Sequence, residues 1–284
     1  MKTYSNLELQ IKSARYRIAV LKYIKKARAG HTGGSLSCTD ILNVLYNDVL
    51  QLGPENFSDK KRNRYIQSKG HSVEALYVVL ADKGFFPESD LEQLCRANSR
   101  YVGHPTRKVP GIEFNTGALG HGLSISSGIA LAGKMDQSPF RVYTLLGDGE
   151  LGEGSNWEAA MMAAHYKLDN LTAILDHNTL QITGPNREVC SPYPIDEKFR
   201  AFGWNVVETN GNDIAILREA FRSMPVNKGM PTLLIAHTVK GKGVSFMEQK
   251  KQWHHGVPSD EQYEQAMKEL QDNLDLLQAQ QVES

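Results

Sequence analysis

The chain has 284 residues, of which 40% are hydrophobic and 23% are charged, and its 32 basic and 32 acidic residues give a formal net charge of zero. This composition is typical of a globular protein with a sizeable core. The balanced charge argues against a nucleic-acid partner. The sequence has no run of about 18 apolar residues, so we expect no membrane span.

Two further features of the sequence bear on the cell compartment. Residues 1–10 are polar and lack the apolar segment of a signal peptide. The three cysteines are odd in number and far apart, so they predict neither a disulfide framework nor a zinc site: Cys38, Cys95 and Cys190. We therefore expect a protein of the reducing cytoplasm.

The first third of the chain predicts helices. Apolar residues recur at helical spacing from Leu7 to Leu21, and Gly30 is suited to the position just after the end of that helix. Further helices are expected over residues 40–50 and 73–80, the latter ended by Gly84. Residues 97–122, by contrast, are rich in glycine and proline and have no period, which predicts a long functional loop.

The rest of the chain alternates between strand and helix. After a helix of small residues at 122–134, apolar runs predict strands at 142–146, 171–175, 205–208 and 232–237. Helices are expected between them, over residues 157–168 and 213–224. This alternation predicts an α/β fold, a parallel sheet flanked by helices on both faces.

The tail and the absence of linkers bear on domain organisation. A helical tail begins at about residue 259, where Ser259 and Gln262 form a capping-box pattern. The sequence has no internal repeat and no interdomain linker, so we expect residues 1–284 to form one domain with this tail.

Polar residues follow two of the predicted strands. Asp148, in Gly147-Asp148-Gly149, and Asn178 each come just past an apolar run, where open α/β sheets bind ligands. An acid and an amide oxygen on neighbouring strand ends can hold a hard divalent cation, and such a cation can carry a diphosphate. Asp-Gly on its own is a common turn dipeptide, so the interpretation depends on its surroundings.

Histidines beside glycines form a second pattern. Five of the nine histidines have a glycine neighbour, where chance predicts about one or two: His31, His71, His104, His121 and His255. This suits loops that fold tightly near a ligand, and histidine is suited to proton transfer near neutral pH. We expect a cluster lining one pocket. The spacing does not predict a zinc pair on a helix.

Taken together, the motifs resemble the N-terminal, diphosphate-binding half of the transketolase family. The matching stretches occur in family order and cover most of the chain: Gly30–Ser37, Ser68–Ser72, Gly103–Pro105, Thr116–Gly122, Gly147–Gly154, Leu175–Asn178 and Thr238–Gly243. The resemblance implies the thiamine-diphosphate-binding (PP) fold. It also implies thiamine diphosphate and Mg2+, or Ca2+ or Mn2+, as cofactors.

The resemblance implies roles in cofactor binding, residue by residue. Asp148, the Asn178 side-chain oxygen and the Leu180 carbonyl would bind the metal, and Gly149 would donate its N–H to the diphosphate. The remaining contacts would fall to Gly117 and Leu119 at the aminopyrimidine, Ile182 at the thiazolium, and Lys240 near the diphosphate or thiazolium.

The resemblance also implies roles around the substrate. His31, His71 and His104 would line the donor channel, His71 also contacting the cofactor, and Glu153 would reach the partner domain. One further histidine should contact both diphosphate and substrate, and both His254 and His255 fit that position. The role of His121 stays open. For three other polar residues we expect structural roles: Asp176 and Asp169 as caps or solvated strand ends, and His177 as a loop residue.

The activity that the resemblance implies is transfer of a two-carbon ketol unit from a ketose, phosphorylated or similarly anionic, to an aldose. Single-chain family members continue into a pyrimidine-binding domain, so we expect a partner subunit that carries it and a heterotetramer. Two alternatives stay open. One is the α subunit of another thiamine enzyme, such as a 2-oxoacid dehydrogenase, and the other is a cofactor-binding subunit without turnover.

Overall fold

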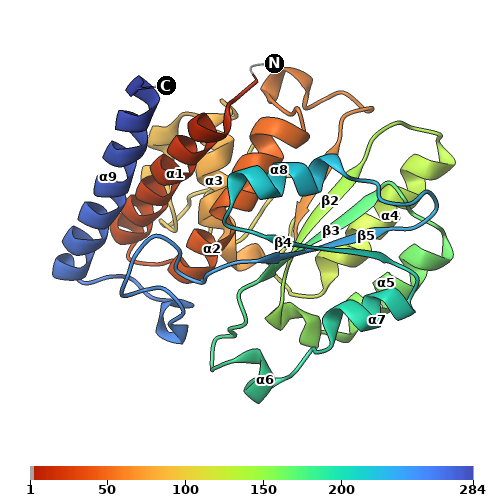
Figure 1. Ribbon diagram of the computed structural model, residues 1–284. Helices are drawn as coiled ribbons and strands as arrows, with labels where there is room; N and C mark the ends of the chain where they lie inside the picture. Colours follow the sequence, from red (N-terminus) through yellow and green to blue (C-terminus); the bar gives the residue numbers. More distant parts are fainter. Residues whose placement is uncertain (1–2, 284) are drawn as a thin grey trace.

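The computed structural model describes residues 3–283 and has a five-stranded parallel sheet at its centre (Figure 1). The strand order is β1-β2-β3-β5-β4, and the strands are β1 (Arg64–Gln67), β2 (Val142–Gly147), β3 (Leu171–His177), β4 (Asn205–Asn210) and β5 (Thr232–His237). The four predicted strands are confirmed. β1 is a short edge strand that the apolar pattern does not predict.

Helices cover both faces of the sheet, as the strand–helix alternation predicts (Figure 1). One face is covered by α2 (Thr32–Val44), α3 (Val73–Asp82) and α8 (Ile214–Arg222), and α1 (Asn6–Ala27) packs on α2 and α3. The other face packs against α4 (His121–Met135), α5 (Gly154–His165) and α7 (Ile195–Ala201). The short α6 (Asn186–Val189) lies outside these layers, in the connection that leaves β3.

The start of α2 differs from the prediction. The helix begins at Thr32, not at residue 40, and ends in a π-helical turn, Leu45–Val49. Its first turn contains Gly33 and Gly34, which are poor helix formers. Packing requires a small residue here, because a Cβ on Gly33 would lie 2.8 Å from the Trp253 carbonyl oxygen. Tertiary contact therefore outweighs propensity, and His31 becomes the residue just before a helix start.

Two other observed helix ends can be compared with the sequence predictions. α1 ends at Ala27 because Arg28 adopts the left-handed conformation with φ 55°, so the expectation that Gly30 follows the helix end is wrong. The tail forms α9 (Asp260–Glu283), which packs against α1 away from the sheet (Figure 1). The predicted capping box is present, because Ser259 and Gln262 each accept the other's backbone N–H.

Short 3-10 segments connect the main elements: Pro54–Asn56, Gly70–Ser72, Glu88–Gln93, Gly149–Gly152 and Lys251–Trp253. Residues 97–120 contain no helix or strand, as expected of a long loop. Within the described part of the chain, no helix combines the length and the apolar character that crossing a bilayer requires.

Candidate active site

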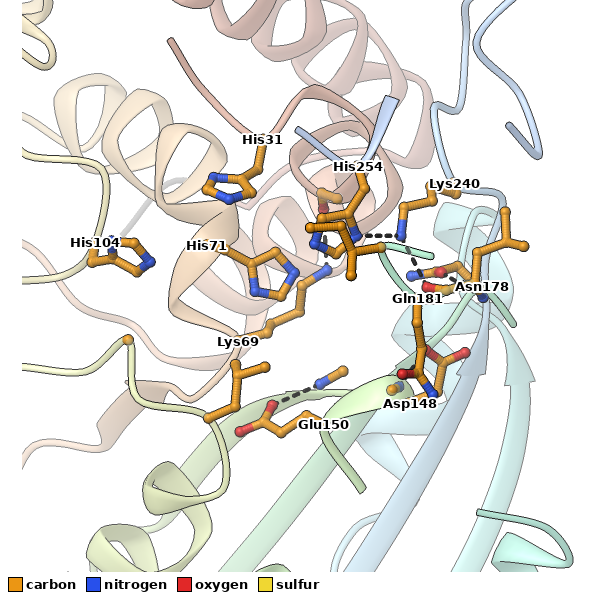
Figure 2. A pocket seen from close by; sticks show the side chains of 17 residues that line it. His31, Lys69, His71, His104, Asp148, Glu150, Asn178, Gln181, Lys240 and His254 are labelled. Atoms are coloured by element: carbon orange, nitrogen blue, oxygen red, sulfur yellow. Dashed lines mark hydrogen bonds between the residues drawn. The ribbon is translucent and has the colours of Figure 1, made fainter. Parts of the chain in front are cut away.

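A cavity of about 310 Å3 lies at the carboxyl ends of β2 and β3, where parallel sheets bind ligands. Nearly all of the expected site residues line it: His31, His71, His104, Gly117, Leu119, Asp148, Gly149, Asn178, Leu180, Ile182, Lys240 and His254. Figure 2 shows His31, His71 and His104 on one side of the cavity and Asp148 and Asn178 on the other. Two expected residues, Glu153 and His255, are exposed and lie outside this lining.

Asp148 is held rigidly at the end of β2. The pairing of Gly147 with Asp176 brings the ends of β2 and β3 side by side, so Asp148 and Asn178 leave the sheet together. The Asp148 carboxylate is 2% exposed and accepts the N–H of Gly149 at 2.8 Å and the N–H of Thr179. Burial, and then the Asp176 charge, raise the pKa of Asp148 to about 6.

The oxygens next to Asp148 come from the loop after β3. The Asn178 side-chain oxygen accepts a hydrogen bond from the Leu180 N–H at 3.2 Å, and the Leu180 carbonyl accepts one from the Lys240 ammonium at 2.9 Å. A carbonyl oxygen has two lone pairs, so this bond leaves one acceptor site free. Lys240 is itself 2% exposed, and burial, followed by the Lys69 charge, lowers its pKa to about 8.

This donor set fits a hard divalent cation with a diphosphate. Asp148 is a buried carboxylate that forms no ion pair with any lysine or arginine of residues 3–283. In the same range, no three histidine, cysteine, aspartate or glutamate side chains gather into a metal-binding cluster. A cation at Asp148 would thus take its further ligands from amide and carbonyl oxygens and from the diphosphate, which is oxygen chemistry suited to Mg2+ or Ca2+.

The histidines gather opposite this oxygen set. The His31 ring centroid lies 5.3 Å from that of His71 and 6.0 Å from that of His104. Burial lowers the pKa of all three rings, to about 4 for His31, where the neighbouring His255 and His104 add to the effect. These imidazoles are therefore neutral at pH 7, and each ring can both donate and accept a hydrogen bond.

The structure separates the two candidate histidines near residue 255. His254 lines the cavity, stacks on His71 at 5.0 Å between centroids, and accepts the Lys240 ammonium on Nδ1 at 3.0 Å (Figure 2). His255 is exposed, although its ring lies 4.6 Å from that of His31. The geometry therefore favours His254 as the histidine that faces cofactor and substrate.

Sequence reasoning missed a buried ion pair at the wall of the cavity. Lys69, which is 1% exposed, pairs with Asp176, which is 0% exposed and also accepts Ser37 and Thr238 hydroxyls. The expectation that Asp176 is a cap or a solvated strand end is wrong. Although burial lowers the pKa of Lys69, the Asp176 carboxylate reverses the effect, and the pKa is raised overall. Ser68–Ser72 matched the family pattern, yet the charge of Lys69 carried no signal of its buried partner.

Glu150 is a second residue that sequence reasoning missed. Its buried carboxylate accepts the N–H of Gly147 at 2.9 Å, the N–H of Gly120 at 2.8 Å and the Ser68 hydroxyl. It thereby ties the end of β2 to the start of α4, and a Gly-Asp-Gly-Glu run gives no sign of this.

The structure shows where the remaining polar residues lie. Asp169 accepts the N–H of Gly229, a turn residue, at 2.7 Å, so its role is structural but it caps no helix. His177 is the last residue of β3 and not a loop residue; its Nε2 lies 2.9 Å from the Tyr193 hydroxyl. His121 begins α4 and is exposed, with Nδ1 3.0 Å from the Leu119 carbonyl, so it does not line the cavity.

Comparison with known proteins agrees with this geometry. Residues 10–275 match the family described as the thiamine diphosphate binding domain of transketolase. The chain belongs to the transketolase family. It is 50% identical over 271 residues to one of the subunits of apulose-4-phosphate transketolase from Phocaeicola vulgatus, covering 95% of this chain and 96% of that protein. It is 39% identical to the 6-deoxy-6-sulfo-D-fructose transketolase subunit SqwG of a Clostridium species, covering 93% and 97%.

Longer transketolases match over only part of their length. The human enzyme is 37% identical over 257 residues, which are 90% of this chain but 41% of the human protein. The crystal structure of Campylobacter jejuni transketolase superposes with a TM-score of 0.86 at 29% identity, covering 97% of this chain and 46% of that one. The chain thus corresponds to the thiamine-diphosphate-binding part of these proteins, and the predicted fold class is confirmed.

Proposed function

We propose that this chain is the diphosphate-binding subunit of a two-chain transketolase. Its similarity to relatives named as transketolase subunits supports the proposal, since it covers nearly their whole length at up to 50% identity. The partner would be a separate chain carrying the pyrimidine-binding domain, and two copies of each would form a heterotetramer. The single observation that carries the proposal is the cavity, which brings Asp148, Asn178 and Leu180 together opposite a histidine cluster.

In this proposal the chain's own oxygens anchor the cofactor. Asp148, the Asn178 amide and the Leu180 carbonyl would hold Mg2+, or Ca2+ or Mn2+, and through it the diphosphate. Thiamine diphosphate supplies the electron sink for breaking and forming the bond next to the ketose carbonyl. Gly149 follows Asp148 at the start of a 3-10 turn, and Ile182, which is 62% exposed, is free to contact the thiazolium.

The histidines would bind the substrate and move its protons. Lys240 donates to Nδ1 of His254, so the ring proton of His254 lies on Nε2. His254 can then donate to an anionic or hydroxyl oxygen without itself being charged. The neutral rings of His31, His71 and His104 can exchange protons with substrate hydroxyls, each step worth on the order of 10²–10⁴-fold in rate.

We further propose that the donor is an anionic ketose. Support comes from two relatives, one named for a ketose 4-phosphate and one for a 6-sulfo ketose. The cavity in this chain holds Lys69 and Lys240, but both are engaged by protein acceptors. Groups that grip the anionic end of the substrate would therefore come from the partner. A cytoplasmic location stays a prediction.

The deciding experiment assays the chain alone and with its co-purified partner against a panel of ketose phosphates and sulfo-ketoses, with an aldose acceptor. We expect turnover only when both chains, thiamine diphosphate and Mg2+ are present. Turnover by this chain alone would contradict the two-chain proposal. Cofactor binding without turnover on any ketose would favour the non-catalytic alternative, and dependence on a lipoyl domain would favour a 2-oxoacid dehydrogenase subunit.

Asp148→Ala tests the metal assignment in the same complex. We expect this variant to weaken cofactor binding in calorimetry by about 100-fold or more, because it removes the charged ligand of the cation. Asp136→Ala, at the exposed end of α4, serves as the control and should bind as the unmodified chain does. Unchanged binding by the Asp148 variant would contradict the assignment.

A further inference from the structure

The loop after β3 returns to Asp148 through one residue. The backbone N–H of Thr179 bonds the Asp148 carboxylate, and the Thr179 carbonyl accepts the backbone N–H of Asn186 at 2.9 Å. The ends of the intervening loop are held together, because Leu180 and Pro185 form an antiparallel β-bridge and the Gln181 N–H bonds the Gly184 carbonyl at 2.8 Å. Asn186 is therefore fixed directly behind the carboxylate that we propose as the metal ligand.

The side chain of Asn186 is buried and unsatisfied. It is 0% exposed, and neither its amide nitrogen nor its amide oxygen has a hydrogen-bond partner among residues 3–283. Leaving a buried amide without partners is unfavourable, so such groups in native proteins call for an explanation. The amide lies beside Gly149, because a Cβ on Gly149 would lie 3.5 Å from the Asn186 oxygen.

The neighbours of Asn186 link it to Asp148 and to Tyr193. The Asn186 oxygen lies near Gly149, whose N–H bonds the Asp148 carboxylate at 2.8 Å. Tyr193 lies near the same amide; its hydroxyl lies 2.9 Å from His177 Nε2 and its ring centroid 4.3 Å from the Arg187 guanidinium. Tyr193 is thus held from two sides, by His177 and by Arg187.

We propose that Asn186 is a positioning residue for Asp148, its amide donating to the carboxylate and so orienting it when the divalent cation binds. The inference rests on the proposed function, since it assumes that Asp148 binds a cation. Groups that hydrogen-bond a metal ligand typically change metal affinity by 10–100-fold when they are removed. A buried amide that lacks partners without the cation contributes to metal binding and not to the stability of the metal-free fold.

Two asparagine-to-leucine variants separate these effects. Asn47 is also buried, but it lies outside the cavity lining, and its amide nitrogen donates to the Tyr16 hydroxyl at 3.0 Å and to the Asn43 side-chain oxygen at 2.9 Å. In the two-chain enzyme with saturating thiamine diphosphate, Asn186→Leu should weaken Mg2+ binding in calorimetry by about 10-fold or more and leave the melting temperature of the metal-free chain unchanged or higher. Asn47→Leu should lower that melting temperature and leave Mg2+ affinity unchanged.

Tyr193→Phe provides a second test if Asn186→Leu folds poorly. It removes only the hydroxyl beside Asn186 and should give a smaller fall in Mg2+ affinity. Mg2+ affinity equal to that of the unmodified enzyme in a folded Asn186→Leu variant, or in Tyr193→Phe, overturns this inference alone. Failure of the unmodified enzyme to bind Mg2+ with thiamine diphosphate overturns the proposed function as well.

Discussion

The Lys240 ammonium donates to Nδ1 of His254 at 3.0 Å and to the Leu180 carbonyl at 2.9 Å, and so joins the two sides of the cavity (Figure 2). One side chain thus contacts both a proposed metal ligand and the histidine that we propose to face the substrate. The bond fixes the His254 tautomer. After burial, the Lys240 charge is the largest cause that lowers the pKa of His254, to about 3.

Lys240→Met tests this link, because it keeps the apolar stem and removes the charge. We expect kcat to fall by on the order of 10²-fold, since His254 loses its fixed tautomer. The pKa of His254, followed by NMR, should rise toward its ordinary value. Lys242→Met is the control, because Lys242 lies at the surface beside Glu248. An unchanged His254 pKa in Lys240→Met would contradict the electrostatic link.

Loss of either partner of the buried pair Lys69 and Asp176 should destabilise the fold strongly. Lys69→Met leaves the Asp176 charge buried without a cation, and we expect a loss of about 3–5 kcal/mol in the free energy of unfolding, measured in urea. Asp176→Asn added to Lys69→Met should recover part of this loss. Arg100→Met breaks the exposed pair of Arg100 with Asp90 and should cost at most about 1 kcal/mol. Equal effects at the two sites would mean that burial of the pair is irrelevant.

Gly117 is expected to set the position of His104. Its φ is +138°, and a Cβ there would lie 2.8 Å from His104 Cδ2. Gly117→Ala should therefore displace His104 and lower kcat/KM by about 10-fold or more, measured in the two-chain enzyme. Gly128→Ala, in α4, meets nothing within 4 Å and should leave activity unchanged while stabilising the helix by up to about 1 kcal/mol. Normal activity in Gly117→Ala would show that His104 has room to adjust.

The neutral histidines make stability depend on pH. Burial lowers the pKa of His31 to about 4, whereas an unfolded histidine has a pKa of about 6.5. The unfolded chain then binds more protons between these values, so this contribution to stability is present above pH 6.5 and is lost as the pH falls toward 4. Asp148, whose pKa burial raises to about 6, contributes with the opposite sign.

A variant isolates the histidine contribution. When the pH is lowered from about 7.5 to about 5, we expect the melting temperature of His31→Asn to fall less than that of the unmodified chain, because the variant lacks this proton uptake on unfolding. Equal losses in the two proteins would mean that His31 titrates alike in the folded and unfolded chains.

Much of the site follows from the sequence because parallel strands end at a common edge. Asp148 and Asn178 could be placed together from two apolar runs alone. The choice between His254 and His255 could not, because it depends on the approach of Lys240, which follows β5. The Asp176 network likewise joins Ser37, Lys69 and Thr238, segments far apart in the chain, and no local pattern encodes such an assembly.

The most direct test of the central claim is a crystal structure of the two-chain enzyme grown with thiamine diphosphate and Ca2+. The account predicts one ion bound by the Asp148 carboxylate, the Asn178 side-chain oxygen and the Leu180 carbonyl at about 2.3–2.6 Å, with diphosphate oxygens completing its shell. A cofactor bound with its diphosphate away from Asp148, or an ion that does not contact Asn178, would contradict it.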